Sequence, residues 1–511
     1  MLIDRLLQES SQRHPEKTVL VHAGRRAGYA EIFERSMGLA SVLQGLGLKK
    51  GDRVVIALEN SAEYLIAYFG ALLAGCVTVP ISPATSAPGY HKIMSDCGPS
   101  AVISGPALLK ALEKQKTPCA VLYILVGGSL DCAAPPGTLL TSFEECSTRG
   151  AGSLKGPARS EKDLASIIYT SGTTGNPKGV MLSHMNLSAN TESIIKYLGL
   201  TASDSVMVVL PFHYSYGNSL LLTHVSIGGT LVADRSFIYP NVMLELMNKE
   251  RVTGFAGVPS TFAILHHRSN FKHSEFPHLR YITQAGGPMP HAMAYEILKT
   301  VPHTKLYIMY GQTEASARLS YLPPEDLHRK HGSIGKAIPG VRLDVLNEKG
   351  EPVKPGETGE IAACGENIMM GYWENPDETA RTIRGGRLFT GDMATVDDEG
   401  YIYIISRKSD MIKSGAHRIA PREIEEAILE HPAVLEAAVV GTPDRILGEA
   451  ICAFVVLKDG RACAANDLMR LCRSIIPPFK LPKRICFVPD LPKTASGKIK
   501  KEELKKQRLP R

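Results

Sequence analysis

The sequence predicts a large α/β N-terminal domain with mainly parallel sheets, followed by a small α+β C-terminal domain. Three observations support this prediction: the length of 511 residues, the alternation of β-branched and helical segments up to about residue 400, and a shorter run of such segments afterwards. Single hydrophobic cores stop growing at about 250–300 residues, so we expect the chain to divide. The predicted domains are residues 1–406 and 407–511.

In the larger domain, runs of β-branched residues alternate with helical patterns and Gly/Pro turns. The runs predict strands, and this alternation is typical of parallel sheets. Such runs occupy residues 54–58, 77–81, 101–104, 120–126, 206–210 and 281–285. The apolar stretch 66–81 falls short of the ~20 residues of a membrane-spanning helix, so we expect a buried helix that leads into a strand. The Gly-, Ser- and Pro-rich residues 127–156 are predicted to form a surface connection.

The smaller domain begins with a predicted strand at residues 401–405 and a charged segment at 406–410. Pro421 suits the first turn of a helix, and Glu423, Glu425 and Glu426 suit the positive end of its dipole. Strands are predicted at residues 437–440 and 451–457. This pattern indicates a compact α+β unit.

Composition narrows the function classes. The ten cysteines form no Cys-x-x-Cys pair, which argues against a zinc ribbon, an iron–sulfur site or a disulfide framework. The N-terminus lacks the layout of a signal peptide, so we expect a cytoplasmic protein without a membrane span. Most of the net charge of +7 lies after residue 410. It fits an anionic partner such as coenzyme A or an acidic carrier protein, or a solvated tail, whereas the absence of interleaved aromatics argues against nucleic acid.

The strongest local motif is residues 169–180, Tyr-Thr-Ser-Gly-Thr-Thr-Gly-Asn-Pro-Lys-Gly-Val. Backbone N–H groups of small residues can close around phosphate oxygens, and Lys178 adds a positive charge. Gly179 follows Lys178, so the motif is not a Walker A loop. We predict a phosphate-binding turn between a strand at residues 165–169 and a polar-capped helix. Its residues are Thr170, Ser171, Gly172, Thr173, Thr174, Gly175 and Lys178.

This motif resembles the phosphate loop of the adenylate-forming superfamily, which includes acyl-CoA synthetases, adenylation domains of peptide synthetases and luciferases. Later motifs follow in the family's order, so the resemblance covers essentially the whole chain and is strongest to a stand-alone acyl-CoA synthetase. It implies that ATP and Mg²⁺ are bound. The implied nucleotide-binding residues are Gly286, Gly287 and Pro288 beside adenine, Tyr310 with Gly311 and Gln312 at the adenine face, Thr313 at the α-phosphate, Glu314 at Mg²⁺, and Asp392 with Arg407 at the ribose.

The resemblance also implies a catalytic role for Lys498, beside Thr313 and Glu314. A carboxylate must approach the α-phosphate, and a cation at that point offsets the repulsion between the two anions. The carboxylate of Glu314 suits a hard cation that bridges phosphates. We interpret the neighbouring Lys493, Lys500 and Lys501 as solvated.

Two half-reactions are implied: a carboxylic acid and ATP give acyl-AMP and pyrophosphate, and a thiol then displaces AMP. In the family the small domain is mobile and rotates at a hinge, here Ser409, between the two steps. Gly415 and Ala416 would line the thiol channel. Ser406, Ser409 and Ala416 depart from the usual family residues, and the methyl group of Ala416 would narrow the channel.

The acid pocket is expected around residues 212–217 and after Glu314. Its candidate residues are His213, Tyr214, Tyr216, Ala315 and Arg318. His213 either gates this pocket or packs as a hydrogen-bonded core residue. Arg318 either pairs with a polar group or second carboxylate of the substrate or forms a structural salt bridge. The identity of the acid and the oligomeric state are not specified by the sequence.

The sequence is compatible with four functions. Coenzyme A as the thiol is favoured because no carrier domain is fused to the chain, and loading of a carrier protein's phosphopantetheine is the alternative. A luciferase-like oxygenase would be revealed by light or oxygen consumption. A nucleotide-binding protein without catalysis would have no need of Lys498.

Overall fold

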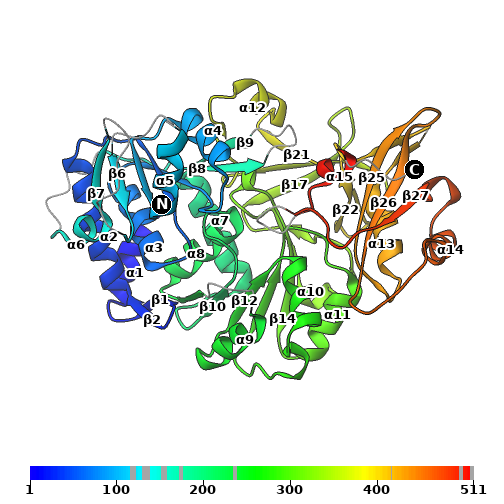
Figure 1. Cartoon of the computed structure of the whole chain (residues 1–511), viewed down its shortest axis with the longest axis horizontal. Helices are drawn as coiled ribbons and strands as arrows, with labels where there is room; N and C mark the ends of the chain where they lie inside the picture. Colours follow the sequence, from blue (N-terminus) through cyan, green and yellow to red (C-terminus); the bar gives the residue numbers. More distant parts are fainter. Residues whose placement is uncertain are drawn as a thin grey trace.

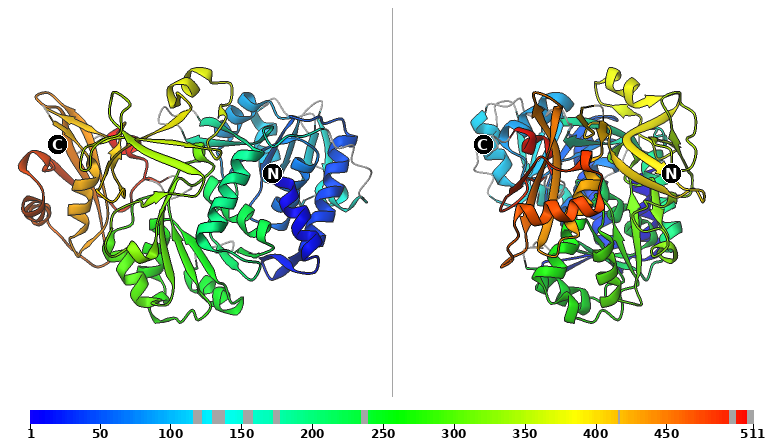
Figure 2. Two further views of the ribbon diagram at one scale, coloured as in Figure 1. Left: turned by 180° about the vertical axis from the view of Figure 1, so that it is seen from behind. Right: turned by 90° about the vertical axis from the view of Figure 1, so that its right-hand side faces the viewer.

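The computed structural model describes residues 1–115, 122–128, 138–150, 158–171, 177–233, 239–415, 417–493 and 499–506. Within these ranges the chain forms two large sheets, a smaller antiparallel sheet and a C-terminal sheet (Figure 1). The C-terminal sheet lies at the end of the molecule opposite the N-terminal eight-stranded sheet, as both the front and back views show (Figures 1 and 2).

The eight-stranded sheet has the order β19-β9-β8-β4-β3-β5-β6-β7. The strands from β8 to β7 are parallel, whereas β9 pairs antiparallel with both β8 and β19. Its strands are β3 (Arg53–Ala57), β4 (Val77–Pro80), β5 (Ala101–Ser104), β6 (Leu122–Leu125), β7 (Leu139–Ser142), β8 (Leu164–Ser171), β9 (Pro177–Ser183) and β19 (Gly371–Tyr372).

The nine-stranded sheet has the order β16-β15-β14-β13-β12-β10-β11-β1-β2 and is parallel from β14 to β1. Its strands are β1 (Thr18–His22), β2 (Arg25–Gly28), β10 (Ser205–Val208), β11 (Thr230–Ala233), β12 (Gly254–Gly257), β13 (Tyr281–Gln284), β14 (Lys305–Tyr310), β15 (Ser320–Leu322) and β16 (Lys336–Ala337).

Helices cover both faces of each large sheet. One core fills the space between the two sheets and includes α1, α2, α3 and α8, while α4 and α5 cover the outer face of one sheet and α9, α10 and α11 that of the other. These helices and the others of the N-terminal part are α1 (Ile3–Arg13), α2 (Tyr29–Gly45), α3 (Ala62–Leu73), α4 (Ala87–Cys97), α5 (Pro106–Gln115), α6 (Phe143–Thr148), α7 (His184–Leu198), α8 (Ser215–Ile227), α9 (Pro240–Lys249), α10 (Pro259–Arg268), α11 (His291–Thr300) and α12 (Pro376–Thr382), with the 3-10 helices η1 (Phe271–His273), η2 (Thr313–Ala315) and η3 (Pro324–Asp326).

The smaller antiparallel sheet joins β17 to β22. Its strands are β17 (Val341–Leu346), β18 (Gly359–Gly365), β20 (Ile383–Arg384), β21 (Arg387–Val396) and β22 (Ile402–Arg407). Because β21 and β22 carry residues 392 and 407, the position of this sheet decides where the predicted ribose-binding residues lie.

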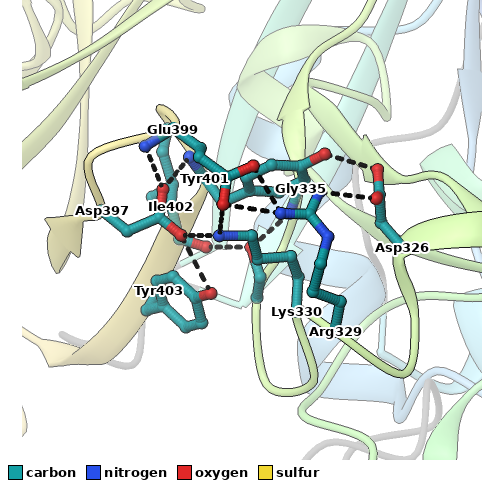
Figure 3. A network of polar contacts seen from close by, with 10 residues as sticks. Asp326, Arg329, Lys330, Gly335, Asp397, Glu399, Tyr401, Ile402 and Tyr403 are labelled. Carbon is teal, nitrogen blue, oxygen red and sulfur yellow. Dashed lines mark hydrogen bonds and ion pairs between the residues drawn. The ribbon is translucent and has the colours of Figure 1, made fainter.

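An ion-pair network connects the turn between β21 and β22 to the loop after β15 (Figure 3). Lys330 Nζ lies 2.7 Å from Asp397 and 2.6 Å from Glu399, and Arg329 pairs with Asp326 at 2.8 Å. Burial opposes ionisation of Asp397, but the hydrogen bond from Lys330 leaves its pKa below the ordinary value. Hydrogen bonds from Lys330 and Arg329 also lower the pKa of Glu399. The network therefore fixes the smaller sheet against the nine-stranded sheet.

The C-terminal sheet packs helices α13 and α14 on one face and α15 on the other. Its strands are β23 (Ile412–Ser414), β24 (His417–Ile419), β25 (Val434–Asp444), β26 (Gly448–Leu457) and β27 (Arg484–Phe487), and its helices are α13 (Pro421–Leu429), α14 (Ala465–Ile475), η4 (Pro478–Lys480) and α15 (Lys501–Lys506). The guanidinium of Arg422 in α13 donates to the carbonyl of Ile404 in β22 at 2.8 Å, so this unit contacts the N-terminal part.

The predicted fold class is confirmed: parallel α/β sheets precede a smaller α+β unit. The stretch 66–81 is a buried helix followed by a strand, as expected. The predicted surface connection at residues 127–156 is wrong for residues 138–150, where β7 and α6 lie and the side chain of Phe143 is buried in the core; residues 129–137 and 151–156 lie outside the described residues. β22 runs up to Arg407, and the division at residues 406 and 407 stays a prediction. In the described part of the chain no helix is both long and apolar enough to cross a membrane.

Candidate active site

Three of the predicted phosphate-binding residues lie in the paired strands β8 and β9: Thr170 and Ser171 in β8 and Lys178 in β9, where Thr170 pairs with Lys178. The Lys178 Nζ forms an ion pair with Glu378 Oε1 of α12 at 2.5 Å and lies 5.4 Å from the centre of the Tyr372 ring. A carboxylate and an aromatic ring therefore hold this lysine. Ser171 is described in its backbone only, and the turn residues Gly172, Thr173, Thr174 and Gly175 lie outside the described residues.

Tyr310, Asp392 and Arg407 come from three strands and meet in one polar cluster. The Tyr310 hydroxyl donates to Asp392 Oδ2 at 2.6 Å. Arg407 lies opposite Asp392 in the β21–β22 ladder and pairs with Oδ1 at 2.9 Å. Burial and the adjacent carboxylate raise the pKa of Tyr310 well above 10, so the phenol remains a donor at neutral pH. The attraction of Asp392 likewise raises the pKa of Arg407. The predicted adenine and ribose residues are thus brought together.

Thr313 and Glu314 lie in η2. The half-buried residues Gly311 and Gln312 connect them to Tyr310 at the end of β14. Thr313 Oγ1 lies 3.1 Å from Ser215 Oγ at the start of α8. The Tyr372 hydroxyl donates to Glu314 Oε1 at 2.9 Å. A single half-buried carboxylate suits Mg²⁺, which usually takes one or two carboxylates together with substrate phosphates.

Gly286, Gly287 and Pro288 form an exposed loop directly after β13. Gly286 has a φ of +89°, a value that favours glycine, and Gln284 Nε2 donates to the Gly287 carbonyl at 2.7 Å. Because β13 and β14 are parallel, this loop lies at the same edge of the sheet as the end of β14. Ligands of α/β proteins bind at such carboxyl edges.

His213 and Tyr214 precede α8, and their ring centres lie 4.4 Å apart. His213 is only 5% exposed, and neither of its ring nitrogens has a hydrogen-bond partner among the described residues. Burial lowers the pKa of His213 to about 4, so the imidazole is neutral at pH 7. The alternative of a hydrogen-bonded core histidine is wrong within the described ranges of the chain, whereas a gating role stays a prediction.

The side chains of Tyr216 and Arg318 are in contact, and Ala315, the last residue of η2, is buried. The Tyr216 hydroxyl bonds to Thr283, and the guanidinium carbon of Arg318 lies 3.9 Å from the centre of the Tyr216 ring. No described carboxylate pairs with this arginine. The alternative of a structural salt bridge at Arg318 is therefore wrong for the part of the chain that the structure describes.

The predicted hinge residue Ser409 lies between the smaller sheet and the C-terminal sheet, whereas the predicted channel residue Gly415 directly follows β23 of the C-terminal sheet. Ser409 follows β22, and its hydroxyl donates to Asp410 Oδ1 at 3.1 Å. Gly415 has a φ of +60°, and its N–H donates to the Leu447 carbonyl at 2.8 Å. Ala416 and Lys498 lie outside the described residues.

A family model described as AMP-binding enzyme matches residues 7–373, and one described as the C-terminal domain of AMP-binding enzymes matches residues 423–498. The chain belongs to the AMP-binding enzyme family. It is 33% identical to a long-chain-fatty-acid–CoA ligase of Bacillus subtilis over 529 residues, which cover 98% of this chain and 94% of the relative.

Two solved structures are similar to this AMP-binding enzyme over nearly the whole chain. An anthranilate CoA ligase in complex with anthranoyl-AMP has a TM-score of 0.90 at 27% identity and covers 99% of this chain and 96% of its own. The o-succinylbenzoate CoA synthetase of Bacillus subtilis in complex with ATP and a magnesium ion has a TM-score of 0.85 at 28% identity and covers 98% and 99%. The predicted resemblance to adenylate-forming enzymes is confirmed.

Sequence reasoning missed two residues of the site in this AMP-binding enzyme, Tyr372 and Glu378. Tyr372 contacts Glu314 across 58 positions of sequence, and Glu378 contacts Lys178 across 200. No local pattern marks such partners, because only the pairing of β19 with β9 brings them to the site.

The solvated state expected for the C-terminal lysines is wrong for Lys493 and Lys501. Lys493 pairs with Glu436 at 2.8 Å, and Lys501 pairs with Glu425 at 2.6 Å, with all four side chains largely buried. These ion pairs hold the described ends of the segment that carries Lys498 against the C-terminal sheet.

Proposed function

We propose that this AMP-binding enzyme is an ATP-dependent acid–CoA ligase whose substrate is a small-molecule carboxylic acid. In the first half-reaction the acid and ATP give acyl-AMP and pyrophosphate; in the second the thiol of coenzyme A takes the acyl group and AMP leaves. Similarity to CoA ligases over nearly the whole chain supports coenzyme A as the acceptor rather than a carrier protein.

One observation carries the nucleotide part of this proposal. Tyr310, which forms a polar cluster with Asp392 and Arg407, lies three residues before Thr313 and four before Glu314. Asp392 would accept hydrogen bonds from the ribose hydroxyls, with Arg407 beside it. Tyr310 is fixed by its bond to Asp392, so its ring would offer a rigid face to adenine. The loop of Gly286, Gly287 and Pro288 would lie along the other side of the base, with Gly311 and Gln312 continuing the Tyr310 side.

The phosphates would lie between the β8–β9 hairpin and η2. Thr170, Ser171, Gly172, Thr173, Thr174 and Gly175 would surround the outer phosphates with backbone and hydroxyl donors, and Lys178 would add positive charge. Thr313 would bond the α-phosphate. Glu314 would hold Mg²⁺, which neutralises phosphate charge when it is bound. Tyr372 positions the Glu314 carboxylate through its hydrogen bond.

In the chemical step, an oxygen of the acid attacks the α-phosphorus as pyrophosphate leaves. Lys498 would place its ammonium group where the two anions approach and stabilise the charge on the five-coordinate phosphorus. The acid chain would lie against His213, Tyr214, Tyr216, Ala315 and Arg318.

In the second step the thiol attacks the carbonyl carbon of acyl-AMP, and AMP leaves. The C-terminal unit would turn at Ser409, so that Lys498 leaves and the segment of Gly415 and Ala416 forms the thiol channel. We place this reaction in the cytoplasm, because ATP and coenzyme A are available there and the described cysteines are free thiols.

Replacement of Lys498 by alanine tests this assignment. Acid-dependent exchange of pyrophosphate into ATP should fall by about 10²–10³-fold, while thioester formation from supplied acyl-AMP and coenzyme A should be largely spared. Lys500→Ala is the matched control, since Lys500 pairs with Glu503 at 2.8 Å, and it should keep both activities. Equal loss of the two half-reactions in the Lys498 variant would contradict the proposed movement.

A further inference from the structure

Arg318 is a buried charge beside a small, partly open cavity of the N-terminal part. The residue is 3% exposed. The cavity lies between α7, α8 and the strands β13 and β14, and its walls are mostly apolar or aromatic. The residues that line it with Arg318 include Tyr197, Leu198, Tyr216, Leu220 and Met309.

The guanidinium of Arg318 has no carboxylate partner among the described residues, and the only side-chain groups that interact with it by hydrogen bonding there are the hydroxyls of Tyr197 and Tyr216. One of its terminal nitrogens donates to the Ala317 carbonyl at 3.2 Å, and its carbon lies over the Tyr216 ring. Its Nε is buried without any partner, and no described carboxylate pairs with it. A guanidinium has five N–H donors, and burial of an unpaired ion is costly. The site is therefore complementary to an anion.

The backbone holds this arginine in place at the cost of strain. Ser316 and Ala317, directly before it, have φ values of +58° and +124°, which non-glycine residues rarely adopt. The side-chain amides of Asn190 and Asn367 donate to the Arg318 carbonyl at 3.1 and 2.9 Å. Strained backbone of this kind persists where the surroundings impose it, and it clusters at ligand sites.

The position of this cavity relative to the reaction centre suits the far end of the acid. Arg318 follows Glu314 by four residues, and Tyr216 follows Ser215, whose hydroxyl contacts Thr313. An acid whose carboxylate lies at Thr313 would extend past the Tyr216 ring towards the guanidinium. The cavity measures about 10 Å³, roughly the space of one water molecule, so it excludes a long apolar chain, and a carboxylate reaches Arg318 only if the side chains around the cavity move.

We propose that the acid substrate is a short dicarboxylic acid, with its second carboxylate bound by Arg318. This inference rests on the proposed acid–CoA ligase function and specifies its substrate class. The second carboxylate would accept charge-assisted hydrogen bonds from Nε and the terminal nitrogens, which supplies the missing counter-charge.

Pairs of acids that differ only in the distal group test the inference. Aliphatic diacids of four to eight carbons, their half-amides, and monoacids of equal length would be compared by acid-dependent pyrophosphate release, together with benzoate and its carboxylated analogues. The preferred diacid should exceed its matched monoacid by about 100-fold or more in kcat/KM, since a site built for a polar group rejects the analogue that lacks it. The half-amide should fall between them.

Arg318→Met should abolish that preference, lowering kcat/KM for the diacid about 100-fold while the monoacid is unchanged or improved. Arg318→Lys should restore part of the preference, because it keeps the charge. Arg280→Met is the matched control: Arg280 also lies over a tyrosine ring, at 5.1 Å from Tyr281, but it is paired with Asp204 at 2.9 Å. Its loss should affect both acids of a pair alike.

The outcomes distinguish failure of the proposed diacid specificity from failure of the proposed ligase function. Activation of monoacids or half-amides at least as efficiently as diacids would overturn the inference and leave the ligase function standing. So would a diacid preference that survives in Arg318→Met, or a uniform loss for all acids with unchanged relative rates. Absence of pyrophosphate release with every acid would overturn the proposed function itself.

Discussion

Replacing Glu378 by glutamine is expected to tighten ATP binding. In this structure Glu378 holds Lys178, a residue proposed to bind the phosphates, at 2.5 Å. ATP must therefore displace a carboxylate from the lysine before phosphate can take its place. Glutamine keeps the size of the side chain and removes the charge, so it weakens the competitor without altering the packing of α12.

The size of the effect follows from the exposure of the pair. The side chains of Lys178 and Glu378 are 20% and 27% exposed, so their attraction is partly screened by solvent. Pairs of this kind contribute up to about 1 kcal/mol. That energy corresponds to a decrease of about three- to fivefold in the Kd for ATP. The gain should shrink as ionic strength rises, because salt weakens the pair in the wild-type protein as well.

Isothermal titration with ATP and Mg²⁺ at two salt concentrations would measure this change. Asp377→Asn, in the same first turn of α12, is the matched control and should leave the Kd unchanged. In a Lys178→Met background the Glu378→Gln change should have no effect. Weaker ATP binding in the single variant, or a gain that persists without Lys178, would refute the reasoning.

Three further changes test other parts of the structure. Tyr310→Phe removes the donor to Asp392 and should raise the KM for ATP about tenfold or more, because hydrogen bonds to charged groups contribute ~1.5–3 kcal/mol; an unchanged KM would contradict the assignment. Gly311→Ala places a Cβ 1.9 Å from the Ala317 carbonyl oxygen, so pyrophosphate exchange and Tm should both fall, and wild-type behaviour would show that the turn is misplaced. Lys330→Met removes the ion pairs of Lys330 with Asp397 and Glu399, whose pKa values are lowered in the folded protein. The stability that these ion pairs give the fold is present above the ordinary pKa values of 3.8 and 4.5 and is lost as pH falls. Between pH 7 and pH 3.5 the Tm of the Lys330→Met variant should therefore fall less than that of the wild-type protein. An equal fall of Tm in both proteins would contradict the role of the ion-pair network.

The parallel strands could be predicted because each is a short buried apolar run between turns. β9 could not, since it begins Pro-Lys-Gly and resembles a continuation of the turn. Its strand conformation depends on pairing with β8 and with β19, about 190 residues later in the sequence. β7 and α6 were missed for a related reason: the polar stretch around them conceals Phe143, whose burial depends on packing against distant helices.

In the site, too, local sequence predicts the residues but not the contacts that depend on distant parts of the chain. Tyr310, Asp392 and Arg407 could be proposed as partners because each lies in a contiguous motif of a known family. Their mutual bonds depend on how the smaller sheet is attached to the nine-stranded sheet. The environment of Arg318 is set by a strained turn and by side chains from four elements. The sequence could therefore name the residue but could not decide between a structural salt bridge and pairing with a polar group or second carboxylate of the substrate.

Formation of acyl-AMP before any thiol is involved can be measured by exchange of labelled pyrophosphate into ATP in the absence of coenzyme A. We expect exchange that requires the acid and Mg²⁺, and release of AMP with one equivalent of thioester once coenzyme A is added. Exchange that requires coenzyme A, or turnover that yields ADP and phosphate, would contradict this mechanism.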